Sequence, residues 1–539
     1  MMKQTLLIEL LTEELPPKVL EKLSTTFANE VFAALKEQAL LGEASACTPY
    51  CTPRRLAVSI TDVEAQQADR IIERKGPAVA SGLDAEGKPT KALEGFMRSA
   101  NVVLAQLQRV SDGKAEYFMA RIEQPGKSLE EYISAIIMQA LKKLPVPKLM
   151  RWGDLEHQFV RPVHGLTVLH GSDVVHAEVL GLSSGNVTSG HRFLCTERVS
   201  IAHADDYEAT LARDGRVVAS FANRRESISA RLDQLAEQNN AIWIGHANFD
   251  QSRLMSMSNE ERSLLSTLLD EVTALVEWPE VYVGQFEAEY LEVPQECLIL
   301  TMQQNQKYFP LLDAQTGKLL NKFLIVSNMQ IADPHHIIEG NQRVVRPRLA
   351  DARFFFNQDR KQKLETRVEK LGNVVYHNKL GSQLQRVERI TTLAGTIARL
   401  LGADKADAEL AARLSKADLI TDMVGEFPEL QGIIGHYYAL HDGEKPEVAS
   451  AIEAHYHPRF AGDTLPQGAL ACAVALADKL ETLVGIYGVG QVPTGDKDPF
   501  GLRRQALGIL RILIETPLDL SLPALLKATA DNFPQGMLS

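Results

Sequence analysis

A chain of 539 residues with 45% hydrophobic content is long enough to build about three or four domains with their own cores, which excludes a small module held together by disulfides. Its formal net charge of −12 excludes indiscriminate nucleic-acid binding, because a polyanion is repelled except where basic residues cluster. The five cysteines are odd in number and scattered, and glutamates interrupt the apolar start of the chain. We therefore expect reduced thiols in a cytoplasmic protein without a secretory signal or a membrane span.

An α/β pattern is predicted for the N-terminal part of the chain. Thr5–Leu10 has the composition of a strand, and Pro16 and Pro17 then open a helix whose apolar residues recur every three or four positions from Val19 to Leu35. Further elements are predicted as strands at Arg55–Ile60, Tyr117–Ile122, Leu166–His170 and Arg216–Ser220 and as a helix at Ser128–Leu144.

A mainly helical interval is expected from Phe221 to Glu277, and short strands follow it. These strands are predicted at Val281–Val283, Gln306–Leu312 and Phe323–Ser327, with a hairpin loop at Asp313–Gly317.

The segment Gly340–Lys361 combines six basic residues with three consecutive phenylalanines in a chain that is otherwise acidic. A helix over Leu349–Gln358 would turn Ala352 and Phe355–Phe356 inward and leave the arginines for an anion. These arginines are Arg343, Arg346, Arg348 and Arg353. A guanidinium group suits phosphate because its planar fork donates two hydrogen bonds at once.

From about Arg360 onward the pattern is almost wholly helical. Apolar residues recur at three- and four-residue spacing in Lys379–Leu401, Ala406–Val424, Glu447–His455, Gly468–Ile486 and Pro499–Thr516, and a shorter helix begins at Pro523–Ala530. An all-α domain is therefore expected in this part of the chain.

Two further pairs of basic residues stand at the start of predicted elements. They are Arg54, Arg55, Arg503 and Arg504. The basic segments also have a purely structural interpretation, and the residue types do not decide between it and phosphate binding. The arginines of the phenylalanine-rich segment would form solvated ion pairs with Asp351 and Asp359, and the pair after Pro499 would serve helix capping and ion pairing.

Six segments in the same order carry a resemblance to a known family. They are LLTEELPP (Leu10–Pro17), EVTALVEWPEVYVGQF (Glu271–Phe286), QKYFPLLD (Gln306–Asp313), GNQRVVRPRLADARFFFNQDRK (Gly340–Lys361), DMVGEFPELQGIIGHYYA (Asp422–Ala439) and ADKLETLVGIYGVGQVPTGDKDPFGLRR (Ala477–Arg504). Together they resemble the β subunits of bacterial glycyl-tRNA synthetases, essentially from end to end. The resemblance implies one chain of an α2β2 heterotetramer that attaches glycine to tRNA(Gly), with ATP and Mg²⁺ used at the catalytic α subunit. It implies no catalytic residue, metal or cofactor in this chain.

The resemblance also implies an α+β multidomain organisation. Residues 1–204 would form an N-terminal α/β domain that resembles the tRNA-binding domain of synthetase β subunits, and residues 205–359 a helical insertion with an α/β tRNA-binding region. Residues 360–515 would form an all-α, degenerate HD-like domain. Residues 516–539 would begin a C-terminal region whose anticodon-binding domain is absent from a truncated chain. Contacts with tRNA are then expected from the three groups of arginines named above.

An HD phosphohydrolase centre needs a histidine, a His-Asp pair and a later aspartate to hold its metal ion. The candidates by resemblance are His377, Asp418 and Asp478, and Ala417 stands where the histidine of the pair should be. Because the loss of one ligand weakens a metal site badly, we predict a degenerate domain without hydrolase activity. A metal-dependent HD phosphohydrolase remains the alternative function.

Overall fold

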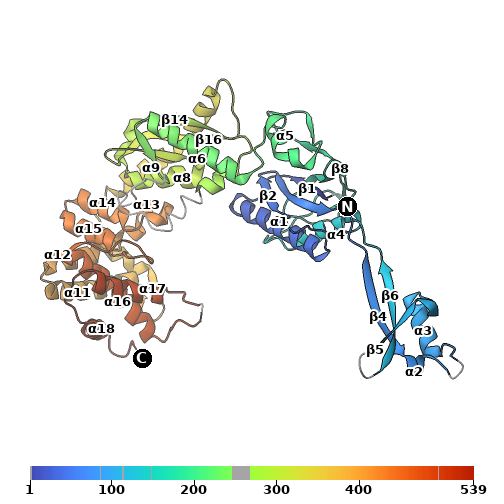
Figure 1. Ribbon diagram of the computed structural model, residues 1–539. Helices are drawn as coiled ribbons and strands as arrows, with labels where there is room; N and C mark the ends of the chain where they lie inside the picture. The colour runs from blue at the N-terminus through green and yellow to red at the C-terminus, as the bar shows by residue number, and fades with distance from the viewer. Residues whose placement is uncertain are drawn as a thin grey trace. The chain divides into compact units, whose positions relative to one another are not determined.

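The computed structural model describes residues 3–84, 87–111, 115–146, 148–245, 268–495 and 497–538. They fall into two compact units, residues 1–227 with 271–279 and residues 228–270 with 280–539. The first unit is built on an antiparallel sheet, and the second contains another sheet followed by a helical region (Figure 1). The predicted order, an N-terminal sheet region and then a helical region, is confirmed.

A five-stranded antiparallel sheet in the order β2-β3-β1-β7-β8 organises the first unit. Its strands are β1 (Lys3–Thr12), β2 (Cys47–Thr52), β3 (Arg55–Glu64), β7 (Val163–His170) and β8 (Asp173–Val174). In the central strand β1 every residue from Thr5 to Thr12 is buried, so both faces of the strand are covered. Ile8 lies opposite Val58 of β3 and Val168 of β7. The strands predicted in this region are confirmed, apart from one corrected below.

Helices cover both faces of this sheet. On one face lie α1 (Leu20–Glu37) and α4 (Leu129–Lys142), and the stripe predicted for the first helix is buried there. On the other face, Tyr207 of α5 (Tyr207–Arg213) packs in one apolar cluster with Leu7. Ser128, the predicted start of this helix, is the N-cap of α4 and forms a capping box with Glu131.

The remaining elements of the first unit are small. A three-stranded sheet in the order β4-β6-β5 lies between β3 and α4 in the chain and carries two helices. These elements are β4 (Arg70–Ala78), α2 (Val79–Gly82), α3 (Lys91–Ala100), β5 (Leu107–Ser111) and β6 (Glu116–Gln124). Two strand pairs follow, β9 (Glu178–Val179) with β10 (Leu182–Ser183) and β11 (Val187–Ser189) with β12 (Arg198–Ser200).

The strand predicted at Arg216–Ser220 is wrong. Arg216 has a left-handed backbone with φ of 53°, and the amide of Val217 bonds back to the carbonyl of Leu211. Val218 donates its amide to the carbonyl of Glu277 instead of to a neighbouring strand. The segment is apolar enough for a strand, but its backbone groups are satisfied without a ladder.

The second unit begins with a four-stranded antiparallel sheet in the order β13-β15-β16-β14. Its strands and the helices beside it are β13 (Ala241–Trp243), β14 (Glu280–Gln285), α8 (Gln295–Gln306), β15 (Phe309–Asp313), β16 (Leu319–Ser327) and α9 (His335–Asp359). The three predicted strands are confirmed, although Gln306 belongs to α8. The interval predicted as mainly helical holds β13 after α6 (Phe221–Gln238), and its residues 246–267 lie outside the described residues.

A helical bundle forms the rest of the second unit. Its helices are α10 (Glu365–Val368), α11 (Gln383–Leu400), α12 (Lys405–Leu414), α13 (Asp422–Glu426), α14 (Ile433–Asp442), α15 (Pro446–Ala454), α16 (Gly468–Gly488), α17 (Leu502–Glu515) and α18 (Leu522–Asp531), with a strand pair at β17 (Val375–His377) and β18 (Gly381–Ser382). α16 is the central helix, because it packs against α11, α15, α17 and α18 and is buried nearly all round. Figure 1 shows it within the bundle.

One predicted helix of the bundle is broken. The segment Ala406–Val424 stops at Leu414, continues as a 3₁₀ turn at Ala417–Ile420 and restarts as α13, which Thr421 caps. The break lets the carboxylate of Asp418 turn inward and accept the backbone amides of Gly432 and Gly435, so tertiary contacts override the helical periodicity. Within the described ranges, the structure contains no helix with the length and apolarity needed to cross a membrane.

Candidate nucleic-acid interface

α9 carries the arginines of the phenylalanine-rich segment on its outer side. The helix predicted over Leu349–Gln358 is confirmed and extends further, from His335 through Pro347 to Asp359. Its buried side is formed by Val345, Leu349, Ala352 and Phe356, with Phe355 partly buried against the same core. Because these side chains take the inner face, the arginines between them are directed to solvent.

Each of the four arginines on α9 pairs with a carboxylate at the surface. The pairs are Arg343–Glu339 at 3.3 Å, Arg346–Glu287 at 2.6 Å, Arg348–Asp351 at 4.0 Å and Arg353–Glu289 at 3.0 Å. The exposed fraction of the arginine side chains runs from 31% for Arg353 to 74% for Arg343. Such exposed pairs contribute only about 0–1 kcal/mol, so an RNA phosphate can replace the carboxylate on a guanidinium group.

The alternative interpretation of solvated ion pairs holds for Asp351 and is wrong for Asp359. The carboxylate of Asp359 is buried, and its Oδ1 accepts hydrogen bonds from Arg367 at 3.2 Å and from the amide of Asp422 at 3.0 Å. Its Oδ2 accepts from the hydroxyl of Tyr438 at 3.0 Å. Asp359 therefore joins the end of α9 to the helical bundle, because its oxygens satisfy donors that would otherwise be buried without partners.

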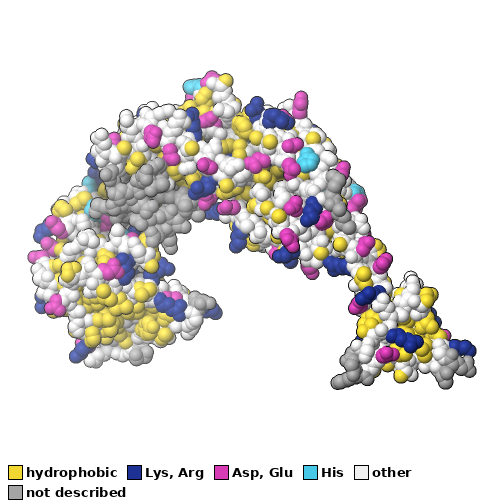
Figure 2. Space-filling view, viewed as in Figure 1, with side chains coloured by type: hydrophobic (Ala, Val, Ile, Leu, Met, Phe, Trp, Pro, Cys, Tyr) yellow, Lys and Arg dark blue, Asp and Glu magenta, His cyan; other side chains and the backbone are white. Residues whose placement is uncertain are grey.

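Basic side chains do not form one continuous surface on the side of the molecule that Figure 2 shows. Lys and Arg side chains there are interspersed with Asp and Glu. This pattern fits the net charge of −12 and favours local contacts with phosphates over a general attraction to nucleic acid.

Arg503 and Arg504 occupy the first turn of α17 and are both exposed. The carboxylate of Asp498 accepts the amides of Leu502 at 2.8 Å and of Arg503 at 2.9 Å, so capping accounts for the aspartate. The guanidinium of Arg503 donates to the carbonyl of Gly495 at 2.5 Å. Arg504 has no hydrogen bond or ion pair with any described residue, which leaves its guanidinium available to an anion.

Arg54 and Arg55 are neighbours with opposite environments. Arg55 is fully buried, with Glu9 at 3.5 Å and Glu277 at 3.6 Å. Its guanidinium is not accessible to an RNA phosphate, so the expectation that Arg55 contacts tRNA is corrected. Arg54 is half-buried, and its Nε and Nη1 atoms are buried without a hydrogen-bond partner among the described residues, as is the hydroxyl of the adjacent Thr12.

The three residues suggested as remnants of an HD centre do not converge on a metal site. The imidazole Nδ1 of His377 accepts the amide of Lys379 at 3.2 Å, and its ring contacts Phe500. Asp478 instead pairs with Lys416 at 3.2 Å and with Arg386 at 2.9 Å. Among the residues that the structure describes, no group of three or more His, Cys, Asp or Glu side chains is placed to hold a metal ion.

Lys416 is one of the buried cations around Asp478. Its Nζ lies 2.6 Å from Nε2 of His455 and 4.0 Å from the centre of the Tyr456 ring. Burial lowers the pKa of Lys416 to about 8, although Asp478 favours its ammonium form. Burial raises the pKa of Asp418 to about 6, although the hydrogen bonds that its carboxylate accepts favour the charged form and lower the pKa.

No sequence pattern pointed to Lys416 and Arg386, which neutralise Asp478. Sequence patterns cannot identify such partners, because an isolated lysine or arginine on a helix is normally solvated. The only signal was the position of Lys416, directly before the Ala417-Asp418 pair.

Known proteins match this chain over nearly its whole length. The family model described as glycyl-tRNA synthetase beta subunit matches residues 6–538. The glycine–tRNA ligase beta subunit of Neisseria meningitidis serogroup B is 56% identical over 539 residues, which cover 100% of this chain and 75% of the relative. The corresponding subunits of Aromatoleum aromaticum and Dechloromonas aromatica are 56% and 52% identical, over 99% of this chain and 74% and 75% of their own lengths.

Proposed function

Because the chain belongs to the family of glycyl-tRNA synthetase β subunits, we propose that it binds tRNA(Gly) and assembles with a catalytic α subunit for the ATP-dependent attachment of glycine. The match from residue 6 to residue 538 carries this proposal. In it, ATP and Mg²⁺ are used at the α subunit, the two kinds of chain form an α2β2 heterotetramer, and the complex works in the cytoplasm.

The proposed tRNA contacts in the second unit are the arginines of α9 and the two arginines in the first turn of α17. In the first unit the proposed contact is Arg54. Phosphate contacts position an RNA, and base contacts or its shape then provide specificity. Four of these arginines are supported by their exposure and their weak partners: Arg504 has none among the described residues, and Arg343, Arg346 and Arg348 have only surface carboxylates. Arg54 is supported only by guanidinium nitrogens that have no hydrogen-bond partner among the described residues.

We infer that residues 360–515 form a degenerate HD-like domain. The support is the cation beside Asp478. The ammonium group of Lys416 lies 3.2 Å from this carboxylate and so takes the place that a metal ion bound to Asp478 would occupy. The alternative function, a metal-dependent phosphohydrolase, has no support from the family assignment or from the described residues.

The test of the proposed function is glycylation of tRNA(Gly) by the purified α subunit, with and without this chain and with a form extended to the full length of its relatives. We expect activity only when a β chain is present, because the proposed tRNA contacts lie on it. A control uses the same mixtures with a tRNA for another amino acid. An α subunit that reaches full activity alone would contradict the proposal.

A charge reversal on α9 tests the proposed tRNA contacts. We expect Arg346→Glu with Arg348→Glu to weaken tRNA binding and to reduce the slope of log affinity against log salt by about 2, because two phosphates are then no longer neutralised. Both side chains are exposed, so folding should be unchanged. Binding titrations at several salt concentrations measure the effect.

The matched control for this prediction is Arg399→Glu with Lys405→Glu. It changes the charge equally at exposed positions of the helical bundle. Equal effects of the two double variants would mean that only overall charge matters, and the α9 surface would then lose its assignment.

A further inference from the structure

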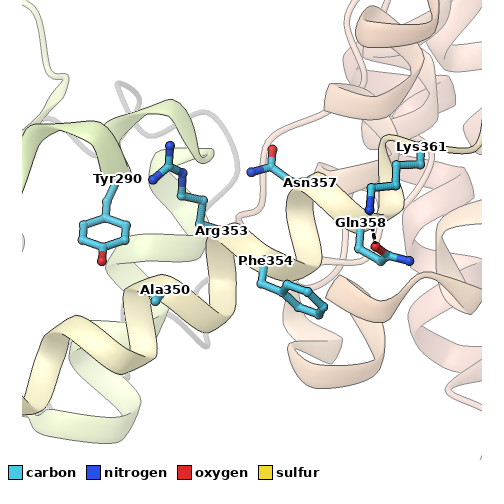
Figure 3. Close-up of a pocket in the computed structure, with 7 residues that line it drawn as sticks. All are labelled: Tyr290, Ala350, Arg353, Phe354, Asn357, Gln358 and Lys361. Atoms are coloured by element: carbon cyan, nitrogen blue, oxygen red, sulfur yellow. Dashed lines mark hydrogen bonds between the residues drawn. The ribbon is translucent and has the colours of Figure 1, made fainter.

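A shallow pocket of about 310 Å³ opens along α9. It is lined by Tyr290, Ala350, Arg353, Phe354, Asn357, Gln358 and Lys361 (Figure 3). Tyr290 comes from the short 3₁₀ helix Ala288–Glu292, and five of the other residues share one stripe of α9 at three- and four-residue spacing. Lys361 follows shortly after the end of that helix. The volume lies at the lower end of the range of about 300–1,000 Å³ that is typical of small-ligand sites.

Phe354 supplies an aromatic face that the fold does not use. Its side chain is 62% exposed, whereas Phe356, two residues later, is buried. Figure 3 shows the ring of Phe354 projecting away from the helix axis. The ring of Phe355 lies edge-on to it, with 5.7 Å between centroids. A single exposed ring is common on protein surfaces, so its neighbours decide what it can bind.

The neighbours of Phe354 are amides. Asn357 has no side-chain hydrogen bond with any described residue, and Gln358 uses only its Oε1, which accepts from the ammonium of Lys361 at 2.8 Å. Each amide offers both donors and an acceptor, which is the combination that the edge of a nucleobase requires. A purely phosphate-binding surface would not need these groups.

Cations stand at both ends of the pocket. Arg353 holds Glu289 at 3.0 Å and Glu292 at 3.4 Å, and both carboxylates are more than half exposed. The ammonium of Lys361 is bound only to Gln358 among the described residues. Because exposed ion pairs are weak, either cation can turn to a phosphate that arrives with a base.

We propose that this pocket binds one unstacked nucleotide of the tRNA. Phe354 stacks on the base, Asn357 and Gln358 hydrogen-bond its edge, and Arg353 or Lys361 contacts the adjoining phosphate. The inference rests on the proposed function and adds a base contact to its phosphate contacts. Aromatic side chains and amides that receive a splayed base are the usual means of reading single-stranded RNA.

The test compares tRNA(Gly) binding by the assembled α and β subunits carrying Phe354→Ala, Phe354→Tyr or the control Val344→Ala. Val344 is also exposed on α9 and lies outside the pocket. We expect Phe354→Ala to weaken binding about 5- to 150-fold without changing the salt slope, because stacking is removed while the phosphate-binding cations remain. The tyrosine variant should bind like the wild type, because its ring still stacks, and the control should be unaffected.

Further results decide the proposal. A fully paired RNA duplex should bind the wild type and Phe354→Ala equally, since it offers no unstacked base. If Phe354→Ala binds tRNA as tightly as the wild type does, the pocket assignment is overturned and the proposed function stands. No salt-dependent tRNA binding by the wild type would overturn the proposed function itself. A Phe354-dependent affinity for free AMP or CMP, with none for tRNA, would show a mononucleotide site instead.

Discussion

Replacement of Arg55 by methionine is expected to lower the free energy of unfolding of the first unit by about 3–5 kcal/mol. Arg55, Glu9 and Glu277 are each at most 2% exposed, and the guanidinium is the cation between the two carboxylates. The hydroxyl of Tyr207 donates to Glu9 at 2.5 Å, and that of Thr52 donates to Glu277 at 2.7 Å. These neutral donors would remain in the variant, but both buried carboxylates would lose the guanidinium group that lies within 4 Å of them.

Amide hydrogen exchange along β1 and β3 measures this loss locally, which avoids treating a two-unit chain as a two-state system. The neighbouring Arg54→Met is the matched control. Its Nε and Nη1 have no hydrogen-bond partners among the residues that the structure describes, so its effect on stability should stay within about 0.5 kcal/mol. Adding Glu9→Gln and Glu277→Gln to Arg55→Met should recover part of the stability. Equal destabilisation by the two arginine variants would show that buried charge is not the cause.

The second large effect is expected at Asp478. Asp478→Asn should destabilise the helical bundle by about 3–5 kcal/mol at pH 6, because it leaves the buried Lys416 and Lys479 and the largely buried Arg386 around a neutral side chain. Burial by itself would raise the pKa of Asp478, but Lys416 and Arg386 outweigh it and hold this pKa below its usual range. The carboxylate is therefore charged throughout the neutral range, and the variant loses its attraction for these cations.

The destabilisation should shrink as the pH rises. Lys416, whose pKa burial lowers to about 8, binds its proton less tightly in the folded chain than in the unfolded chain, where its pKa is 10.5. The folded state therefore gains stability as the pH rises from about 8 towards 10.5. Without Asp478 the ammonium form of Lys416 is disfavoured further, so Lys416 loses its proton at a lower pH. The variant should therefore be less destabilised at pH 9 than at pH 6.

Hydrogen exchange of the α16 amides at the two pH values measures both effects. Asp407→Asn is the control, because among the described residues it breaks only the surface pair with Lys445 and should have a much smaller effect on stability. Adding Lys416→Met to Asp478→Asn should restore stability in part. An Asp478→Asn variant of unchanged stability that abolished a metal-dependent phosphatase activity of the wild type would contradict the structural role of Asp478.

The proposed tRNA contacts were predictable from sequence only in part. The phenylalanine-rich segment of α9 stood out by composition, and its periodicity predicted that Ala352 and Phe356 would be buried and the arginines exposed. The same periodicity could not show that Phe354, the first of the three phenylalanines, lines a pocket together with Tyr290, because Tyr290 comes from another element.

By itself the sequence determined where most helices and strands form and which family the chain belongs to. Spacing of apolar residues reports burial within one element, so the buried stripe of α1, the strand β1 and the central helix α16 followed from it. Tertiary structure alone decided the roles of the charged residues. Arg54 and Arg55 are adjacent arginines with opposite environments, and only the fold brings Glu277 to Arg55. It also brings Arg386 and Lys416 to Asp478. The physical reason is that the partner of a buried charge is set by packing between distant segments, which local patterns do not record.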